Sequence, residues 1–124
     1  MLGALRRHHI SFKNAFAGLF WAFRTQPNFR VHFVLSGIVI ILGLFYRITQ
    51  VQWLIIVFTI VLGISGELIN TALEAMTDLI TREWRQEAKI AKDVAAGMML
   101  FISTGSVIVA GFIFIPYLLP RLGL

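Results

Sequence analysis

Three long stretches of this 124-residue sequence contain no Asp, Glu, Lys or Arg, and they cover residues 31–46, 48–66 and 94–120. A helix needs roughly 20 apolar residues to cross a bilayer core about 30 Å thick, and the second and third stretches are long enough. The first has only 16 residues, but it can extend past Arg30 or Arg47 because long basic side chains snorkel to the interface. The sequence therefore predicts three transmembrane helices, at about residues 29–46, 51–78 and 93–119.

The composition agrees with an all-α membrane protein of one integral-membrane domain, residues 1–124. Apolar residues make up 58% of the chain and charged residues 14%, which lies outside the usual balance of soluble domains. The chain has no cysteine, which excludes disulfides, thiolate catalysis and Cys-based metal sites. The N-terminal residues Arg6, Arg7, His8 and His9 are not followed by an apolar run with a cleavage site, so no signal peptide is predicted.

The basic residues predict the orientation in the membrane. Nine lie before the first span or between the second and third, and two lie on the other side: Arg6, Arg7, Lys13, Arg24, Arg30, Arg82, Arg85, Lys89 and Lys92 against Arg47 and Arg121. The positive-inside rule then places the N-terminus and the second loop in the cytoplasm. The net charge of +5 suits anionic lipid headgroups. No solvated basic face with interleaved aromatic residues is present, so nucleic acid is not an expected partner.

An amphipathic surface helix is predicted over residues 10–25, before the first span. Its apolar residues recur at helical spacing: Phe12, Phe16, Leu19, Phe20 and Phe23. Such a helix either lies along the cytoplasmic membrane surface or packs wholly on the protein's own spans, and the pattern leaves both open. Pro27 ends it, because proline fixes φ and pushes the preceding residue towards extended geometry.

Polar residues form a stripe at the cytoplasmic end of the second span, in the run ELINTALEAMTD over residues 67–78. Glu67, Asn70, Glu74 and Asp78 fall within about 80° of one helix face at 100° per residue. Most of the remaining circumference is apolar, so this stripe faces protein rather than lipid. Ionisable groups within a membrane are costly and by default suggest a functional site.

Carboxylates with nearby basic residues are the parts needed for phosphoryl transfer. Carboxylate oxygens can hold Mg²⁺ or act as a base, and Lys or Arg can hold phosphate oxygens. No P-loop or kinase-type glycine loop is present, so such an enzyme would use another fold. The alternative is a non-catalytic assembly or regulatory protein, in which Glu67, Glu74 and Asp78 pair with basic residues to hold helices together. A proton or ion path is a further option, although three short spans leave little room for alternating access.

The motif E-x-x-N-T-A-x-E-x-x-x-D from Glu67 to Asp78, followed by Ala91-Lys92-Asp93, resembles the signature of the bacterial membrane diacylglycerol kinase and undecaprenol kinase family. The NFRVH run over residues 28–32 is also similar to that family, and the resemblance extends from about Arg6 to Pro120. It implies a homotrimer of three-span subunits in the bacterial inner membrane, with a surface helix and with active sites shared between subunits. It also implies an ATP- and Mg²⁺-dependent kinase that phosphorylates a membrane lipid alcohol, undecaprenol or diacylglycerol, at the cytoplasmic face.

The resemblance also implies roles for individual residues. Glu67 would be the general base for the lipid hydroxyl, Asn70 would orient the reacting groups, and Glu74 would hold Mg²⁺. The nucleotide would be contacted by a larger set: Arg7, Asp78, Glu83, Trp84, Arg85, Lys92 and Asp93. Arg30 would lie near the lipid headgroup.

Two residues near the start of the first span complete these expectations. Gln26 stands where many relatives have a glutamate that shares the metal, and its neutral oxygen has the same reach. A lone histidine at the membrane interface is more often an interfacial hydrogen-bonding group than a ligand, so no chemical role is assigned to His32.

Residues 28–32 and 114–116 look more like the undecaprenol-using branch of the family.

Overall fold

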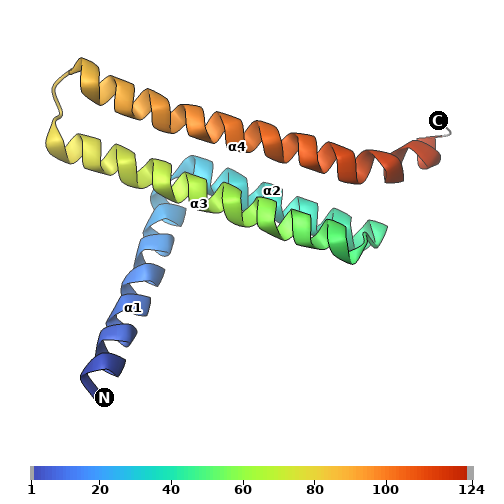
Figure 1. Cartoon of the computed structure of the whole chain (residues 1–124), viewed down its shortest axis with the longest axis horizontal. Helices are drawn as coiled ribbons and strands as arrows, with labels where there is room; N and C mark the ends of the chain where they lie inside the picture. Colours follow the sequence, from blue (N-terminus) through green and yellow to red (C-terminus); the bar gives the residue numbers. More distant parts are fainter. Residues whose placement is uncertain (1, 123–124) are drawn as a thin grey trace.

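The computed structural model describes the backbone of residues 2–122 and the side chains of residues 11–121, and its regular elements are all helices. They are α1 (Leu2–Thr25), α2 (Pro27–Tyr46), α3 (Gln50–Ile80), α4 (Gln86–Leu118) and a closing 3-10 turn, η1 (Leu119–Leu122). Figure 1 shows α2, α3 and α4 side by side along the long axis, while α1 leaves the bundle crosswise. Three segments are long and apolar enough to cross a membrane: Pro27–Tyr46, Gln50–Ile80 and Gln86–Arg121. The prediction of an all-α chain with three spans is confirmed.

Several helix bounds differ from the predicted ones. Helix α4 begins at Gln86 rather than near residue 93, and α1 begins at Leu2 rather than 10, while α3 ends at Ile80, close to the predicted end at about residue 78. For α4 the prediction placed the start of the helix at the start of its apolar stretch. A helix can continue into water where charged side chains support each other at i and i+4, as Lys89 and Asp93 do here. As a result α3 and α4 project beyond the start of α2 (Figure 1).

A tight turn joins α2 to α3 at the end of the bundle away from α1. Arg47 adopts a left-handed conformation with φ 52°, and the N–H of Ile48 donates to the carbonyl of Gly43 at 3.2 Å. This is the hydrogen bond of a Schellman-type helix end. Thr49 then caps α3, because its hydroxyl accepts from the N–H of Gln52 while the Gln52 side chain accepts from the N–H of Thr49.

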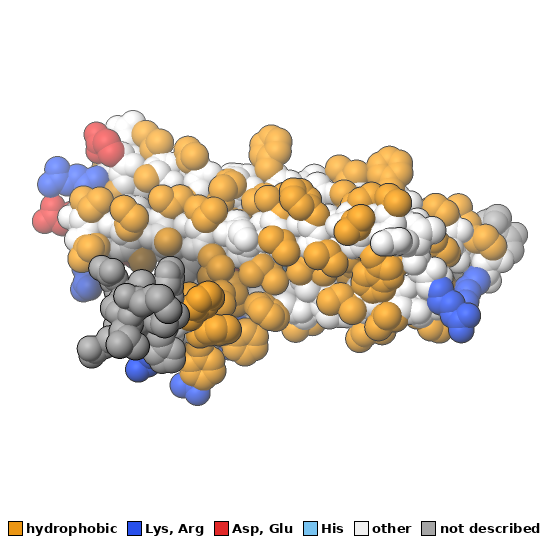
Figure 2. Space-filling view, turned by 60° about the horizontal axis from the view of Figure 1, so that its bottom comes forward, with side chains coloured by type: hydrophobic (Ala, Val, Ile, Leu, Met, Phe, Trp, Pro, Cys, Tyr) orange, Lys and Arg blue, Asp and Glu red, His pale blue; other side chains and the backbone are white. Residues whose placement is uncertain are grey.

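The hydrophobic core lies next to this turn. Ile48, Ile56, Ile113 and Phe114 are buried there, and the Tyr117 hydroxyl donates to Gln52 Oε1 at 2.8 Å, so the end of α4 is fixed to the start of α3. Figure 2 shows hydrophobic side chains along the bundle and charged side chains at its ends. The core therefore closes one end, and the polar stripe of α3 lies towards the other.

Helix α1 contributes little to this packing. Ala22 is buried, and Phe23 meets Phe33 of α2 edge to face with 5.6 Å between ring centroids. Three phenylalanines of its predicted apolar stripe, Phe12, Phe16 and Phe20, are exposed. Within a single chain, α1 does not pack wholly on the protein's own spans.

Gly43 is the residue on which the turn closes. A Cβ at this position would lie 2.8 Å from the Trp53 ring and 3.1 Å from Ile48 Cδ1. We expect Gly43→Ala to destabilise the protein by about 1–3 kcal/mol, the usual cost of overpacking. Thermal unfolding in detergent measures this. Gly37→Ala is the matched control, because a Cβ there meets nothing within 4 Å and the substitution should stabilise the helix by up to about 1 kcal/mol. Equal unfolding temperatures for the two variants would contradict the prediction.

Candidate active site

The polar stripe of α3 enters the protein at Glu67. Glu67 is only 3% exposed, and Asn70 and Thr71 are also buried. Glu67 lines a hollow of about 270 Å³ together with Asn28 and His32 of α2 and Ser103 of α4, and apolar side chains complete its wall. We call this the Glu67 hollow. It places one carboxyl group where three candidate spans meet.

Asn70 lies on the turn of α3 that follows Glu67 and joins it to Glu74. Its Nδ2 donates to Glu74 Oε1 at 3.1 Å, so the two side chains are held together on the same face of α3. The Asn70 Oδ1 atom and the Thr71 hydroxyl are buried without a hydrogen-bond partner among the described residues. A buried polar atom without a partner is unusual in a folded protein, and Asn70 Oδ1 is therefore free to accept a hydrogen bond or contact a cation.

The last member of the stripe pairs with α4. Lys92 Nζ lies 2.6 Å from Asp78 Oδ1, which connects the end of α3 to the first turns of α4. On α4 itself Lys89 pairs with Asp93. The four side chains are largely exposed to solvent, so they form a charged surface beyond the apolar length of the bundle.

The loop between α3 and α4 carries the remaining predicted nucleotide contacts. Arg85 and Glu83 form an ion pair at 3.4 Å, and Trp84 is exposed. Arg85 also lines a hollow of about 460 Å³ between the end of α3 and the start of α4. These residues share the charged end with Asp78 and Lys92. The side chain of Arg7 lies outside the described residues.

Two predicted site residues are not brought to Glu67 within one chain. Arg30 lines a separate hollow with Pro27, Val34 and other apolar residues of α2. It lies two positions from both Asn28 and His32, which line the Glu67 hollow. Residues two positions apart on a helix point in nearly opposite directions. Gln26 is hydrogen-bonded to its neighbour Thr25 at 3.5 Å, and no described hydrogen bond joins it to Glu74 or Asn70.

The structure instead brings in His32, a residue that sequence reasoning left without a role. His32 lies 35 positions before Glu67, and helical periodicity relates only residues within one helix. The signal that pointed to it was its place in the NFRVH run, but the run does not say which neighbour the imidazole faces.

The ion pairs separate the two interpretations of the stripe. Among side chains 11–121 the ion pairs are Arg85–Glu83, Lys89–Asp93 and Lys92–Asp78. The hypothesis that the stripe assembles helices by ion pairing therefore fits Asp78, whereas Glu67 and Glu74 have no Lys or Arg partner among these residues. Of these two carboxyl groups Glu67 is buried, and a buried carboxyl group without a basic partner is more typical of a functional site than of a structural one.

A Mg²⁺ ion would find a partial set of ligands here. Within the described part of the chain no group of three His, Cys, Asp or Glu residues could hold a metal. Glu74 and Asn70 Oδ1 offer two oxygen ligands on adjacent turns, and protein-bound Mg²⁺ commonly takes one or two carboxylates plus phosphate oxygens and waters. The residues fit Mg²⁺ that arrives with a nucleotide rather than a closed protein cage.

Comparison with known proteins decides the family. The pattern that defines prokaryotic diacylglycerol kinase matches residues 13–114 of this chain. The chain belongs to the prokaryotic diacylglycerol kinase family. The family predicted from the 67–78 motif is therefore confirmed, and the matched region holds every predicted site residue except Arg7.

Two named relatives belong with this family. A diacylglycerol kinase of Synechocystis sp. is 39% identical over 89% of this chain and 63% of its own length. An undecaprenol kinase of Bacillus subtilis is 38% identical over 92% of this chain and 93% of its own length. The chain thus spans less than two thirds of the first relative and nearly all of the second. Both names agree with the kinase class predicted from the sequence.

The Asp78–Lys92 pair allows a direct test of the assembly hypothesis. Exposed ion pairs usually contribute about 0.2–1 kcal/mol, so we expect a coupling in that range from a double-mutant cycle with Asp78→Asn and Lys92→Gln. Unfolding in detergent with denaturant gives the free energies. Lys89→Gln with Asp93→Asn provides the comparison within a single helix. A coupling well above 1 kcal/mol would show that the pair holds α3 and α4 together, contrary to expectation.

Proposed function

We propose that this chain is an ATP- and Mg²⁺-dependent lipid kinase that phosphorylates the hydroxyl group of a membrane lipid alcohol at the cytoplasmic face. The observation that carries the proposal is the buried Glu67, which has no basic partner among the described ion pairs and opens into a hollow between three apolar helices. Membership of the family supports it. A carboxylate beside hydrocarbon suits a base whose substrate has a polar end and an apolar body.

In the proposed reaction Glu67 takes the proton of the lipid hydroxyl as that oxygen attacks the γ-phosphorus of ATP. The lipid O–P bond forms while the P–O bond to ADP breaks. Asn70 orients the reacting groups, and its hydrogen bond to Glu74 keeps the two side chains in register. Glu74 and Asn70 would hold Mg²⁺, which neutralises charge on the transferring phosphoryl group.

The nucleotide would bind at the charged end of α3 and α4. Lys92 and Asp93 would contact it, as would Asp78 and the segment 83–85 with Arg7. The ends of α3 and α4, which carry Asp78, Lys92 and Asp93, extend past the start of α2 (Figure 1), where water-soluble ATP has access. Catalysis of phosphoryl transfer consists mostly of positioning and charge neutralisation, and a charged solvated surface on the same helix as a buried base provides groups for both.

The acceptor is undecaprenol or diacylglycerol, the alcohols in the names of the two relatives. Undecaprenol is the first candidate, because this chain spans 93% of the undecaprenol kinase relative and the runs at 28–32 and 114–116 resemble that branch. The enzyme would lie in the bacterial inner membrane with its N-terminus in the cytoplasm, as the basic residues predict. The exposed phenylalanines of α1 suit a helix lying along the membrane surface.

The proposed assembly is a homotrimer with shared active sites. Its support is that Gln26 and Arg30, both expected at the site, do not reach Glu67 or Glu74 within one chain. A neighbouring subunit that supplied them would complete the site.

The general-base role predicts the behaviour of Glu67→Gln. We expect turnover to fall by about 10²–10⁴-fold, the usual contribution of a positioned base, with ATP binding and oligomeric state unchanged. Phosphate transfer from labelled ATP in mixed micelles measures this, with undecaprenol and diacylglycerol offered in parallel. Glu87→Gln, exposed in the first turn of α4, is the control for loss of a carboxylate, because no role is assigned to Glu87. A wild-type chain that is folded but phosphorylates neither lipid would refute the proposed function.

The metal proposal predicts opposite effects at two positions. Gln26→Glu adds a second carboxylate, so half-maximal activity should need less Mg²⁺. Glu74→Gln removes a carboxylate, so half-maximal activity should need a several-fold higher Mg²⁺ concentration. Activity measured over a Mg²⁺ titration gives both midpoints. If neither midpoint moves, the metal is held by other residues.

A further inference from the structure

His32 lies between two hollows. The first is the Glu67 hollow, and the second is an apolar cavity of about 280 Å³ that continues from it between α2, α3 and α4. Leu35, Val39, Ile56 and Val107 are among the residues that line this apolar cavity. His32 and Ser103 line both spaces. They therefore form the wall that the two spaces share, which we call the neck.

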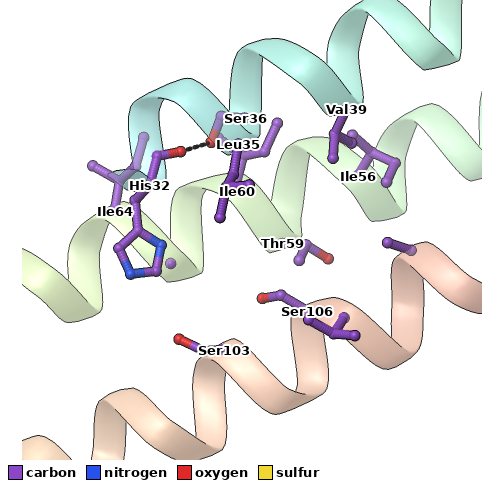
Figure 3. Close-up of a pocket in the computed structure, with 13 residues that line it drawn as sticks. His32, Leu35, Ser36, Val39, Ile56, Thr59, Ile60, Ile64, Ser103 and Ser106 are labelled. Carbon is purple, nitrogen blue, oxygen red and sulfur yellow. Dashed lines mark hydrogen bonds between the residues drawn. The ribbon is translucent and has the colours of Figure 1, made fainter. Parts of the chain in front are cut away.

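The imidazole of His32 packs over α3 just before Glu67. A Cβ on Gly63 would lie 3.7 Å from His32 Nδ1, so the ring rests against a helix position without a side chain. Gly63 and Glu67 are four residues apart and share one face of α3. Figure 3 shows the ring extending from α2 towards Ser103 of α4. The imidazole is thus placed one turn of α3 from the carboxyl group of Glu67.

Three of the four hydroxyl groups that line the apolar cavity, those of Ser36, Thr59 and Ser106, donate to backbone carbonyls of their own helices, and the fourth, Ser103, has no described hydrogen bond. Ser36 donates to the carbonyl of His32 at 2.7 Å (Figure 3). Thr59 donates to the carbonyl of Ile55, and Ser106 to that of Ile102. No described hydrogen bond uses a ring nitrogen of His32, so the imidazole retains an N–H for another partner.

Glu67 is in need of such a donor. Its carboxyl group is buried, and none of the described hydrogen bonds reaches it. The polar groups that face it are Asn28 and His32 from α2 and Ser103 from α4. Only His32 among these three can carry a positive charge, and a buried carboxylate without a hydrogen-bonded partner is costly.

We propose that His32 is a positioning residue for phosphoryl transfer, whose imidazole N–H holds the Glu67 carboxylate in place at the neck where the alcohol end of the lipid arrives. This inference rests on the proposed kinase function. The carboxylate must be aimed at a hydroxyl that enters from the apolar cavity, and His32 stands where that cavity meets the Glu67 hollow. A small misplacement of a catalytic group can reduce turnover by about 10²-fold.

The test replaces the imidazole in two ways. His32→Leu keeps apolar bulk and removes the donor, and we expect kcat to fall about 10–100-fold with the KM for ATP unchanged. His32→Asn keeps a side-chain N–H, and we expect it to recover most of that loss. In a Glu67→Gln background, His32→Leu should cause no further loss, because residues that act as a unit are not additive. Thr104→Val is the control, since its hydroxyl bonds within α4 to the carbonyl of Leu100 and it lines neither hollow.

Two results would overturn the proposal. One is an unchanged kcat in His32→Leu. The other is an equal loss in His32→Leu and His32→Asn together with an equally lowered unfolding temperature, which would show a packing role.

A second measurement keeps this inference separate from the proposed function. If the wild-type chain phosphorylates neither lipid, the function fails, but the proposed hydrogen bond between His32 and Glu67 can still be tested by thermal unfolding. The shift in Tm of the His32→Leu, Glu67→Gln double variant should differ from the sum of the two single shifts. Additive shifts would overturn the hydrogen bond, and therefore the positioning role.

Discussion

The close approach of α4 to α3 at Gly66 is the contact on which the site depends. A Cβ at Gly66 would lie 2.5 Å from Ile102 Cδ1 and 3.1 Å from Met99 Sδ, so a larger residue would force these two side chains of α4 to move. Burying apolar side chains contributes little to the association of helices in a membrane, because lipid tails are equally apolar. Small residues favour association instead, because they allow close van der Waals packing. Glu67 follows Gly66 directly and is buried by the same approach. The helix contact and the removal of the carboxyl group from solvent have one cause.

The two ends of the bundle then serve different purposes. Beyond Gly43 the chain closes through a tight turn, a capped helix and a core that includes Ile56 and Phe114. At the other end α3 and α4 extend past α2 and carry ion pairs in solvent. Rigid packing at one end leaves the polar stripe as the part of the bundle that can receive ligands. The stripe lies between hydrocarbon and water, as a reaction between a lipid and a nucleotide requires.

Much of this arrangement follows from the sequence, because it depends on relations within single helices. Uninterrupted apolar length predicted the three spans, and helical spacing placed Glu67, Asn70 and Glu74 on one face. Relations between helices were not accessible in this way. The position of His32 beside Gly63 depends on how α2 crosses α3, and Arg30 was expected at the site although it points to another side of α2. The helix bounds differed because the limit of a membrane is not the limit of a hydrogen-bonded helix.

The pattern of unsatisfied groups argues for chemistry at this site rather than assembly. A stripe that served only to join helices would place its polar atoms in pairs, as Asp78 and Lys92 are placed, and that pair is exposed, where ion pairs contribute little. The deeper residues of the stripe are not paired in this way. Glu67 is buried without a basic partner among the described ion pairs, and Asn70 Oδ1 has no hydrogen bond. Uncompensated polarity is expensive in a membrane, and here it is concentrated at Glu67 and on the next turn of α3, at Asn70 and Thr71. A substrate that brings a hydroxyl group and phosphate oxygens would supply the missing partners, so the cost is incurred where binding can offset it.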